Sequence, residues 1–327
     1  MSVRSYLNNK FLYDIVIYHD HCSDGLACKW IILPFCKPKT KFIGVCTGMI
    51  EKIDINDFKD KTVIFADLIP TFKQFNILKQ ICSFLTIIDH HLGSLSVFDK
   101  YTKNNINNNI NNTIKVISHK YSIRIDTKLS ACQMAWDYFN INIPRPWTID
   151  YIGDRDLYRF ELENSKEINI AMYKMNLINI EGLNKMINYK KINMDNLIKK
   201  GKEYLKEEHD ICEKAIINAQ HLLLRVVNKT YNVWSVNTEP HMRSSVGNYL
   251  CSVPFKNNQY PDFVIVWRKN NEATEYWISL RGIGKVNLDI VANKLEENGH
   301  GHFDAAGCTL TNDEYDDATT FISNYTT

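Results

Sequence analysis

The sequence predicts an α/β protein with two lobes: an N-terminal, mostly parallel sheet with helices on both faces, a linker helix, and a smaller C-terminal α/β domain. Three observations lead to this prediction. The chain has 327 residues, roughly twice the length of a typical domain. Its first half alternates short apolar runs with helical patterns, which is typical of βαβ units. A long amphipathic segment then separates this half from a second set of strand and helix patterns.

The first half contains four apolar runs with the length and composition of buried strands, and two segments of helical spacing between them. In chain order, we expect strands at 13–18, 41–46, 62–66 and 84–88, and helices at 26–33 and 72–82. In such a sheet, ligands bind at the carboxyl ends of the strands. Polar residues directly after these strands are therefore the first candidates for a functional site.

The rest of the chain falls into a loop, a helical region and a second α/β region. Residues 104–113 (NNINNNINNT) contain seven Asn in ten positions; this composition cannot bury a face and indicates a surface insertion, with a recognition loop as the alternative. Helices are expected from about 130 to 217, and the last of them is an amphipathic linker at 195–220. The expected elements after it are strands at 222–227, 231–236, 263–267 and 276–280, and helices at 287–298 and 314–323. The predicted domains are 1–194, the linker 195–220, and 221–327.

Composition narrows the class of protein. Hydrophobic residues make up 45% and charged residues 23% of the chain, as in folded globular proteins. Lys and Arg number 39 against 37 Asp and Glu, so no overall charge attracts a polyanion, which must be held by a local site. The nine cysteines form no C-x-x-C pair and indicate a reducing compartment. Without a signal-peptide pattern or a long apolar run, a cytoplasmic protein with no membrane partner is expected. No P-loop or G-x-S-x-G element occurs.

Metal-type side chains follow three of the predicted strands and recur in a helical segment. They are His19, Cys22 and Asp24 after the first strand, Asp67 after the third, Asp89, His90 and His91 after the fourth, and Asp154 and Asp156 further on. A desolvated carboxylate is costly unless it is paired or bound to a metal. Two divalent cations bridged by a shared Asp would offset the repulsion, and mixed Asp and His ligands favour Mn²⁺, with Mg²⁺ or Co²⁺ as alternatives. Taken singly, Asp24 or Asp67 could instead be a helix N-cap, and His19 a core histidine.

These motifs resemble the DHH phosphoesterase superfamily. The matching residues are Asp89-His90-His91, the H-x-x-x-x-D-G element from His19 to Gly25, Asp67 after an apolar run, and Asp154 after a glycine. The stretch from Gly299 to Gly307 is similar to the GGGH-x-x-AAG element of the DHH-associated domain, and Ser279-Leu280-Arg281 to the strand that carries its arginine. The resemblance therefore covers nearly the whole chain.

The resemblance implies a ligand set. One metal would be held by His19 and Asp67, and the other by Asp24, Asp67, His90 and Asp154, with Asp67 as the bridge. His91 would face the phosphate as a catalytic group, and Asp89 would orient the histidines. Asp156 is the alternative to Asp154. Cys22 occupies a position where many members have Asp, and its softer thiolate could weaken the first site or change its preferred ion.

On the substrate side, Arg281 and the glycine-rich segment are the candidates for holding phosphate. Backbone N–H groups of Gly299 and Gly301 and the side chains of His300 and His302 could contact it. Tight packing at a turn is the alternative for the glycines, and a zinc site the alternative for the two histidines. Three aromatic residues (Trp147, Tyr158 and Trp277) are either base-stacking platforms or core, and Arg155 and Arg159 contact either phosphates or neighbouring carboxylates.

The resulting functional hypothesis is a metal-dependent phosphoesterase with two Mn²⁺ per chain that hydrolyses short RNA or DNA oligonucleotides or small phosphodiesters. One alternative is an exopolyphosphatase-like or pyrophosphatase-like hydrolase. The other, motivated by Cys22, is an inactive module that binds a phosphorylated ligand. For the oligomeric state, a monomer and a dimer are both compatible with the sequence.

Overall fold

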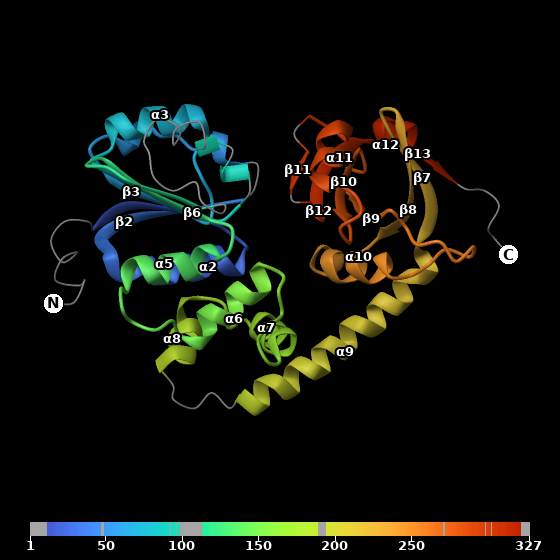
Figure 1. The fold of residues 1–327 in the computed structure, drawn as a ribbon, viewed down its shortest axis with the longest axis horizontal. Helices are drawn as coiled ribbons and strands as arrows, with labels where there is room; N and C mark the ends of the chain where they lie inside the picture. The colour runs from blue at the N-terminus through green and yellow to red at the C-terminus, as the bar shows by residue number, and fades with distance from the viewer. Residues whose placement is uncertain are drawn as a thin grey trace. The chain divides into compact units, whose positions relative to one another are not determined.

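The computed structural model describes residues 12–46, 49–91, 93–95, 97–98, 113–188, 194–270, 272–297, 299–301 and 303–321. The chain divides into two compact units, Met1–Tyr204 and Leu205–Thr327. The division falls within one long helix, α9 (Met194–Asn218). The predicted α/β fold is confirmed, because each unit contains a sheet covered by helices (Figure 1).

The sheet of the first unit has six strands in the order β2-β1-β3-β4-β6-β5. They are β1 (Tyr13–His19), β2 (Cys36–Val45), β3 (Thr62–Ala66), β4 (Phe84–Asp89), β5 (Thr113–Ile117) and β6 (Tyr121–Asp126). All neighbours are parallel except the pair β5 and β6. From β1 the chain passes to β2 on one side and returns to β3 on the other. Such a reversal of direction at the carboxyl ends of β1 and β3 is where open α/β sheets bind ligands.

Helices cover both faces of this sheet (Figure 1). α3 (Phe72–Ile81) lies on one face, and α2 (Ser23–Ile32) and α5 (Ala131–Phe139) lie on the other. Three more helices, α6 (Trp147–Asp156), α7 (Ser165–Lys174) and α8 (Ile180–Asn188), form a further layer beyond α2 and α5. Alternate residues of β1 serve opposite faces: Ile15 and Ile17 pack in the core with α3, and Val16 packs in the core with α2 and α5. Because both faces are covered, the strands are apolar throughout, as in parallel sheets generally.

The second unit contains a seven-stranded sheet in the order β11-β12-β10-β9-β8-β7-β13. Its strands are β7 (Gln220–Val226), β8 (Lys229–Asn237), β9 (Phe263–Lys269), β10 (Glu275–Arg281), β11 (His300–Gly301), β12 (Ala305–Thr311) and β13 (Thr319–Phe321). Helix α10 (Arg243–Cys251) packs on one face, and α11 (Leu288–Leu295) and α12 (Asn312–Ala318) on the other (Figure 1). None of the helices in the described part of the chain is long and apolar enough to cross a membrane.

Several expected boundaries differ from the structure. The helix expected at 314–323 ends at Ala318, and Thr319–Phe321 forms β13, because β-branched residues favour a strand. The edge strand β2 begins at Cys36 rather than at 41. The sequence did not predict its first residues as a strand because Pro38 and the lysines beside it are unusual in a central strand, but an edge strand tolerates both. Of the Asn-rich segment, residues 104–112 lie outside the described residues, and Thr113 begins β5.

Candidate metal centre

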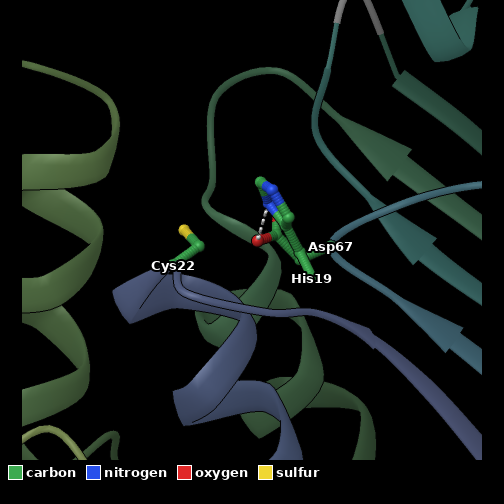
Figure 2. A group of neighbouring side chains, drawn as sticks. All are labelled: His19, Cys22 and Asp67. Carbon is green, nitrogen blue, oxygen red and sulfur yellow. Dashed lines mark hydrogen bonds and ion pairs between the residues drawn. The ribbon is translucent and has the colours of Figure 1, made fainter. Parts of the chain in front are cut away.

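The first group of candidate ligands lies at the point where the strand order of the N-terminal sheet reverses. His19 is the last residue of β1, and Asp67 directly follows β3. His19 Nδ1 is 3.3 Å from Asp67 Oδ2, and Cys22, the residue before α2, lies beside this pair (Figure 2). The three ligand atoms lie within 4.8 Å of one another, so a single cation could contact all three.

The backbone at Asp67 turns sharply as the chain leaves β3. Asp67 has a φ of 61°, and its N–H donates a 2.9 Å hydrogen bond to Ile88 O on the neighbouring strand. Asp adopts this left-handed conformation more readily than most residues. The turn places the carboxylate at the strand ends, where it is 1% exposed. Backbone conformations of this kind concentrate at functional sites, where the surrounding structure maintains them.

His90 joins Asp67 to a second group of carboxylates. His90 Nε2 lies 3.3 Å from Asp67 Oδ1, 3.2 Å from Asp156 Oδ2 and 3.9 Å from Asp24 Oδ2. Two further sets of candidate ligands result, one of Asp67, His90 and His91 and one of Asp24, His90 and Asp156. The two oxygens of Asp67 therefore contact different histidines, which is the arrangement expected of a carboxylate shared between two cations.

Two oxygens of this cluster lie at ion-pair distance from His90 Nε2 but lack the hydrogen bonds that buried polar atoms normally make. Asp67 Oδ1 and Asp156 Oδ2 are buried, and neither makes a hydrogen bond to any residue that the structure describes. Buried polar atoms are almost always satisfied. A divalent cation would satisfy both oxygens, and the mixture of carboxylate, imidazole and thiol suits Mn²⁺ or a similar ion. The residues present therefore fit a metal centre.

The charges of the cluster shift its pKa values in opposite directions. Burial and the charge of Asp67 raise the pKa of Asp24, and burial and the charge of Asp24 raise that of Asp156. Burial also opposes ionisation of Asp67, but contacts with the two neighbouring histidines outweigh it and lower its pKa. Burial lowers the pKa of His90, yet the surrounding carboxylates overcome this and raise it to about 10. Burial raises the pKa of the Cys22 thiol well above its usual range. In the metal-free protein, a protonated His90 is thus the cation that balances the carboxylates.

The remaining histidine is held by a buried carboxylate. Asp89, which is 0% exposed, ends β4, and its Oδ1 lies 2.8 Å from His91 Nδ1. Its other oxygen accepts a short hydrogen bond from Ser94 Oγ. Burial lowers the pKa of His91, but the Asp89 carboxylate more than compensates and raises it. With Nδ1 occupied by Asp89, Nε2 is the atom through which His91 would contact a ligand. Ser94 had no signal in the sequence, because nothing marks its position as close to Asp89.

Asp24 is anchored by the helix opposite it. Its two carboxylate oxygens accept hydrogen bonds from the N–H groups of Ala131 (2.7 Å) and Cys132 (2.9 Å), the first two residues of α5. Unpaired N–H groups and the positive end of the helix dipole favour an anion at this place. Asp24 therefore supports α5 while one of its oxygens lies 3.9 Å from His90.

The structure separates Asp154 from Asp156. Both lie in the last turn of α6, but residues two apart on a helix point to different sides. Asp156 contacts His90 in the cluster. The carboxylate of Asp154 instead accepts hydrogen bonds from the N–H groups of Glu161 (3.0 Å) and Leu162 (3.3 Å) in the loop after α6.

The C-terminal candidates lie around the end of β10. The Arg281 guanidinium donates to Ser244 Oγ (3.2 Å) and to Leu280 O (2.8 Å). The N–H of Gly299 donates to Glu296 O, and the N–H of Gly301 donates to Asp289 Oδ1, each at 2.8 Å. These two amides are therefore already bonded within the protein. His300 begins the short strand β11, whereas His302 lies outside the described residues.

The aromatic and arginine candidates have different surroundings. Trp147 packs at the border of the core that contains α2 and α5, whereas Trp277 is 49% exposed and Tyr158 is 65% exposed. Arg159 donates to Lys128 O (2.7 Å), and Arg155 lies 5.7 Å from the centre of the Tyr173 ring.

No family model matches the sequence. Among curated proteins, the chain is 25% identical over 320 residues to uncharacterized protein R106 of Acanthamoeba polyphaga mimivirus, a match that covers 93% of this chain and 69% of that protein.

Three solved structures are similar to the chain. One is a pGpG-specific phosphodiesterase from Vibrio cholerae, with a TM-score of 0.43, 12% identity, and coverage of 93% of this chain and 95% of the other. An exopolyphosphatase-related protein from Bacteroides fragilis has a TM-score of 0.43 and 13% identity, with coverage of 94% and 89%. RecJ from Thermus thermophilus, in complex with Mn²⁺, has a TM-score of 0.44 and 9% identity, with coverage of 94% and 51%.

Proposed function

We propose that the chain is a divalent-metal-dependent phosphoesterase of the DHH type that hydrolyses short oligonucleotides or small phosphodiesters. One observation carries this proposal: buried carboxylate oxygens of Asp67 and Asp156, without hydrogen bonds in the described part of the chain, lie in one cluster with His19 and His90. Divalent cations would satisfy these oxygens and relieve the repulsion between the clustered carboxylates.

The distances support a specific ligand assignment. We assign His19, Cys22 and Asp67 to one cation, and Asp24, Asp67, His90 and Asp156 to the other, with Asp67 shared. Asp156 replaces Asp154 in this assignment because Asp156 lies 3.2 Å from His90 Nε2, whereas the carboxylate of Asp154 is bonded to the loop after α6. A pair of Mn²⁺ ions supplies charge stabilisation for a phosphoryl oxygen and lowers the pKa of bound water.

Two groups of the protein would act on the substrate directly. His91, held through Nδ1 by Asp89, is suited to stabilise phosphate charge or to pass a proton to the leaving oxygen from Nε2. In the proposed substrate-binding domain, 221–327, Arg281 is the group suited to bidentate phosphate contact. His300 and His302 stay candidates there, whereas the amides of Gly299 and Gly301 are bonded within the protein and would have to exchange partners.

The test is Mn²⁺-dependent release of mononucleotide from a labelled RNA of two to five nucleotides. Asp67→Asn should lower turnover by at least about 10³-fold, because it removes the ligand shared by both cations. Asp57→Asn, a change of the same type at an exposed residue, serves as the matched control and should leave turnover unchanged. Equal turnover by wild type and Asp67→Asn, with both folded, would refute the assignment.

Polyphosphate and pyrophosphate are tested with the same preparation. If the protein hydrolyses only polyphosphate or pyrophosphate, its substrate is a phosphoanhydride and not a phosphodiester. A binding module is the second candidate function, favoured by Cys22, whose sulfur occupies a place in the first ligand group. Binding of Mn²⁺ without turnover of any substrate, together with turnover gained by Cys22→Asp, would identify the thiol as the reason for inactivity.

A further inference from the structure

The loop after α6 has an unusual backbone. At the end of the helix, Arg159 N–H donates to Asp154 O and Tyr158 N–H donates to Arg155 O, each at 2.9 Å. This pair of hydrogen bonds is the Schellman motif, whose left-handed position normally holds glycine. Here Tyr158 occupies that position with a φ of 54°. Tyr158 therefore occupies a position where glycine would cost less conformational free energy.

A second aromatic residue in the loop shows the same feature. Phe160 has a φ of 52°. Three hydrogen-bonding groups fix the loop. The Asp154 carboxylate accepts from the Glu161 N–H, and the Arg159 guanidinium donates to Lys128 O. The Tyr151 hydroxyl donates to Glu163 O. A strained backbone persists only where its surroundings impose it, and such strain concentrates at functional sites. The arrangement indicates that the loop serves to present its two rings.

The two rings meet at an interplanar angle of 78° and have positive charge beside them. Tyr158 and Phe160 meet edge to face, with ring centres 5.0 Å apart. Tyr158 is 65% exposed, so most of its surface can contact a ligand. Lys166 Nζ lies 5.3 Å from the centre of the Phe160 ring. Exposed aromatic rings next to cations are the usual surface for stacking a nucleobase while the backbone phosphate is held nearby.

The two rings are close along the chain to the candidate metal centre. Tyr158 follows Asp156 by two residues, so their Cα atoms are at most about 7.6 Å apart. Asp156 Oδ2 is itself 3.2 Å from His90 Nε2. A polyphosphate chain would gain nothing from aromatic rings, whereas a nucleotide could bring its phosphate to the cluster and its base to the exposed Tyr158 ring.

We propose that Tyr158 and Phe160 form a stacking subsite for the nucleobase next to the scissile phosphate. The inference rests on the proposed phosphoesterase function and narrows its substrate class to nucleotides. Asp154 is a positioning residue of this subsite, because its carboxylate holds the loop that carries the rings.

The test compares base-bearing and abasic substrates. Hydrolysis is measured for a dinucleotide and for the two dinucleotides in which one or the other base is replaced by hydrogen. Tyr158→Gly keeps the left-handed backbone and removes the ring, and Tyr158→Phe keeps the ring. Tyr158→Gly should lower kcat/KM for the dinucleotide by about 5- to 150-fold, and Tyr158→Phe should stay within about twofold of wild type. On the abasic substrate whose missing base is the one that stacks, all three proteins should be equal.

Three outcomes would overturn the subsite. The first is an unchanged kcat/KM in Tyr158→Gly. The second is a loss of kcat/KM in Tyr158→Gly that is equal for base-bearing and abasic substrates. The third is a change in the oligomeric state of Tyr158→Gly without a change in its affinity for the nucleotide. Mn²⁺ affinity is measured in each variant and should not change.

If wild type hydrolyses none of the substrates, the proposed function fails, and the subsite is then tested by calorimetric binding of the dinucleotide. A fivefold or greater loss of affinity in Tyr158→Gly supports the subsite independently of turnover, and equal affinities refute it.

Discussion

Replacing Asp154 and Asp156 of α6 one at a time separates a structural anchor from the proposed metal ligand. In Asp154→Asn, the side-chain oxygen can accept only one of the two N–H groups, from Glu161 and Leu162, that the carboxylate accepts. The new amide group then faces the other N–H, donor against donor. In Asp156→Asn, a buried charge beside His90 is removed instead.

The structure gives the expected magnitudes. Losing one hydrogen bond to a charged group costs about 1.5–3 kcal/mol, and the 3.3 Å bond to Leu162 places Asp154→Asn at the lower end. For a unit of this size, that corresponds to a fall in Tm of roughly 3–8 °C. Asp156→Asn should not lower the Tm of the metal-free protein, because burial and the charge of Asp24 already raise the pKa of Asp156 and make its ionised form unfavourable.

Calorimetry measures both consequences. Thermal unfolding without metal gives the Tm of each variant, and titration with Mn²⁺ gives its affinity. Asp156→Asn should weaken Mn²⁺ binding by at least about 100-fold, more than is typical for a residue that only supports a ligand, and Asp154→Asn should leave it within about threefold. The reasoning would be refuted if folded Asp154→Asn lost Mn²⁺ binding while Asp156→Asn retained it.

Three further predictions concern stability. In Gly25→Ala, the added Cβ would lie 2.0 Å from His19 O, so α2 must move away from β1; we expect a loss of more than about 2 kcal/mol in urea unfolding, and an unchanged midpoint would contradict this contact. Tyr158→Gly should raise the free energy of unfolding by about 1 kcal/mol, because glycine adopts the left-handed conformation without a Cβ penalty; a destabilised protein would show that the ring packs in the fold rather than serving a ligand. Lys37 and hydrogen bonds lower the pKa of Asp14 although burial opposes them, so the pair stabilises the fold above about pH 4 and this stabilisation is lost as the pH falls. Lys37→Met should therefore cost up to about 1 kcal/mol at pH 7, and less in acid or high salt; a difference independent of pH would rule out the ion pair.

Much of the fold was predictable because local patterns and the final packing agree. The runs at β1, β3 and β4 are apolar for most of their length since both faces of the sheet are covered, and they agree with the predicted strands to within one residue. The prediction was weaker where packing decides between similar local choices. β12 (Ala305–Thr311) begins at the end of the glycine-rich motif and was not predicted as a strand, because Ala and Gly have little strand propensity; pairing with β10 and β11 holds them there.

The candidate site shows the same limit. Strand ends in the sequence pointed to His19, Asp67 and His90, and the structure gathers their side chains at one edge of the sheet. The choice between Asp154 and Asp156 could not be made from the sequence, since both follow the same motif and differ only in which side of α6 they occupy. The rotation of α6 against the sheet decides which one contacts His90.

The sequence by itself determined the alternation of strands and helices and the residue types that end each strand. Those properties follow from hydrophobic periodicity and turn chemistry, which act over neighbouring residues. Only the tertiary structure decided that Asp67 lies between two histidines, that α5 anchors Asp24, and that Tyr158 occupies a glycine position beside Asp156. These are relations between residues up to about a hundred positions apart, and they exist only once both faces of the sheet are packed.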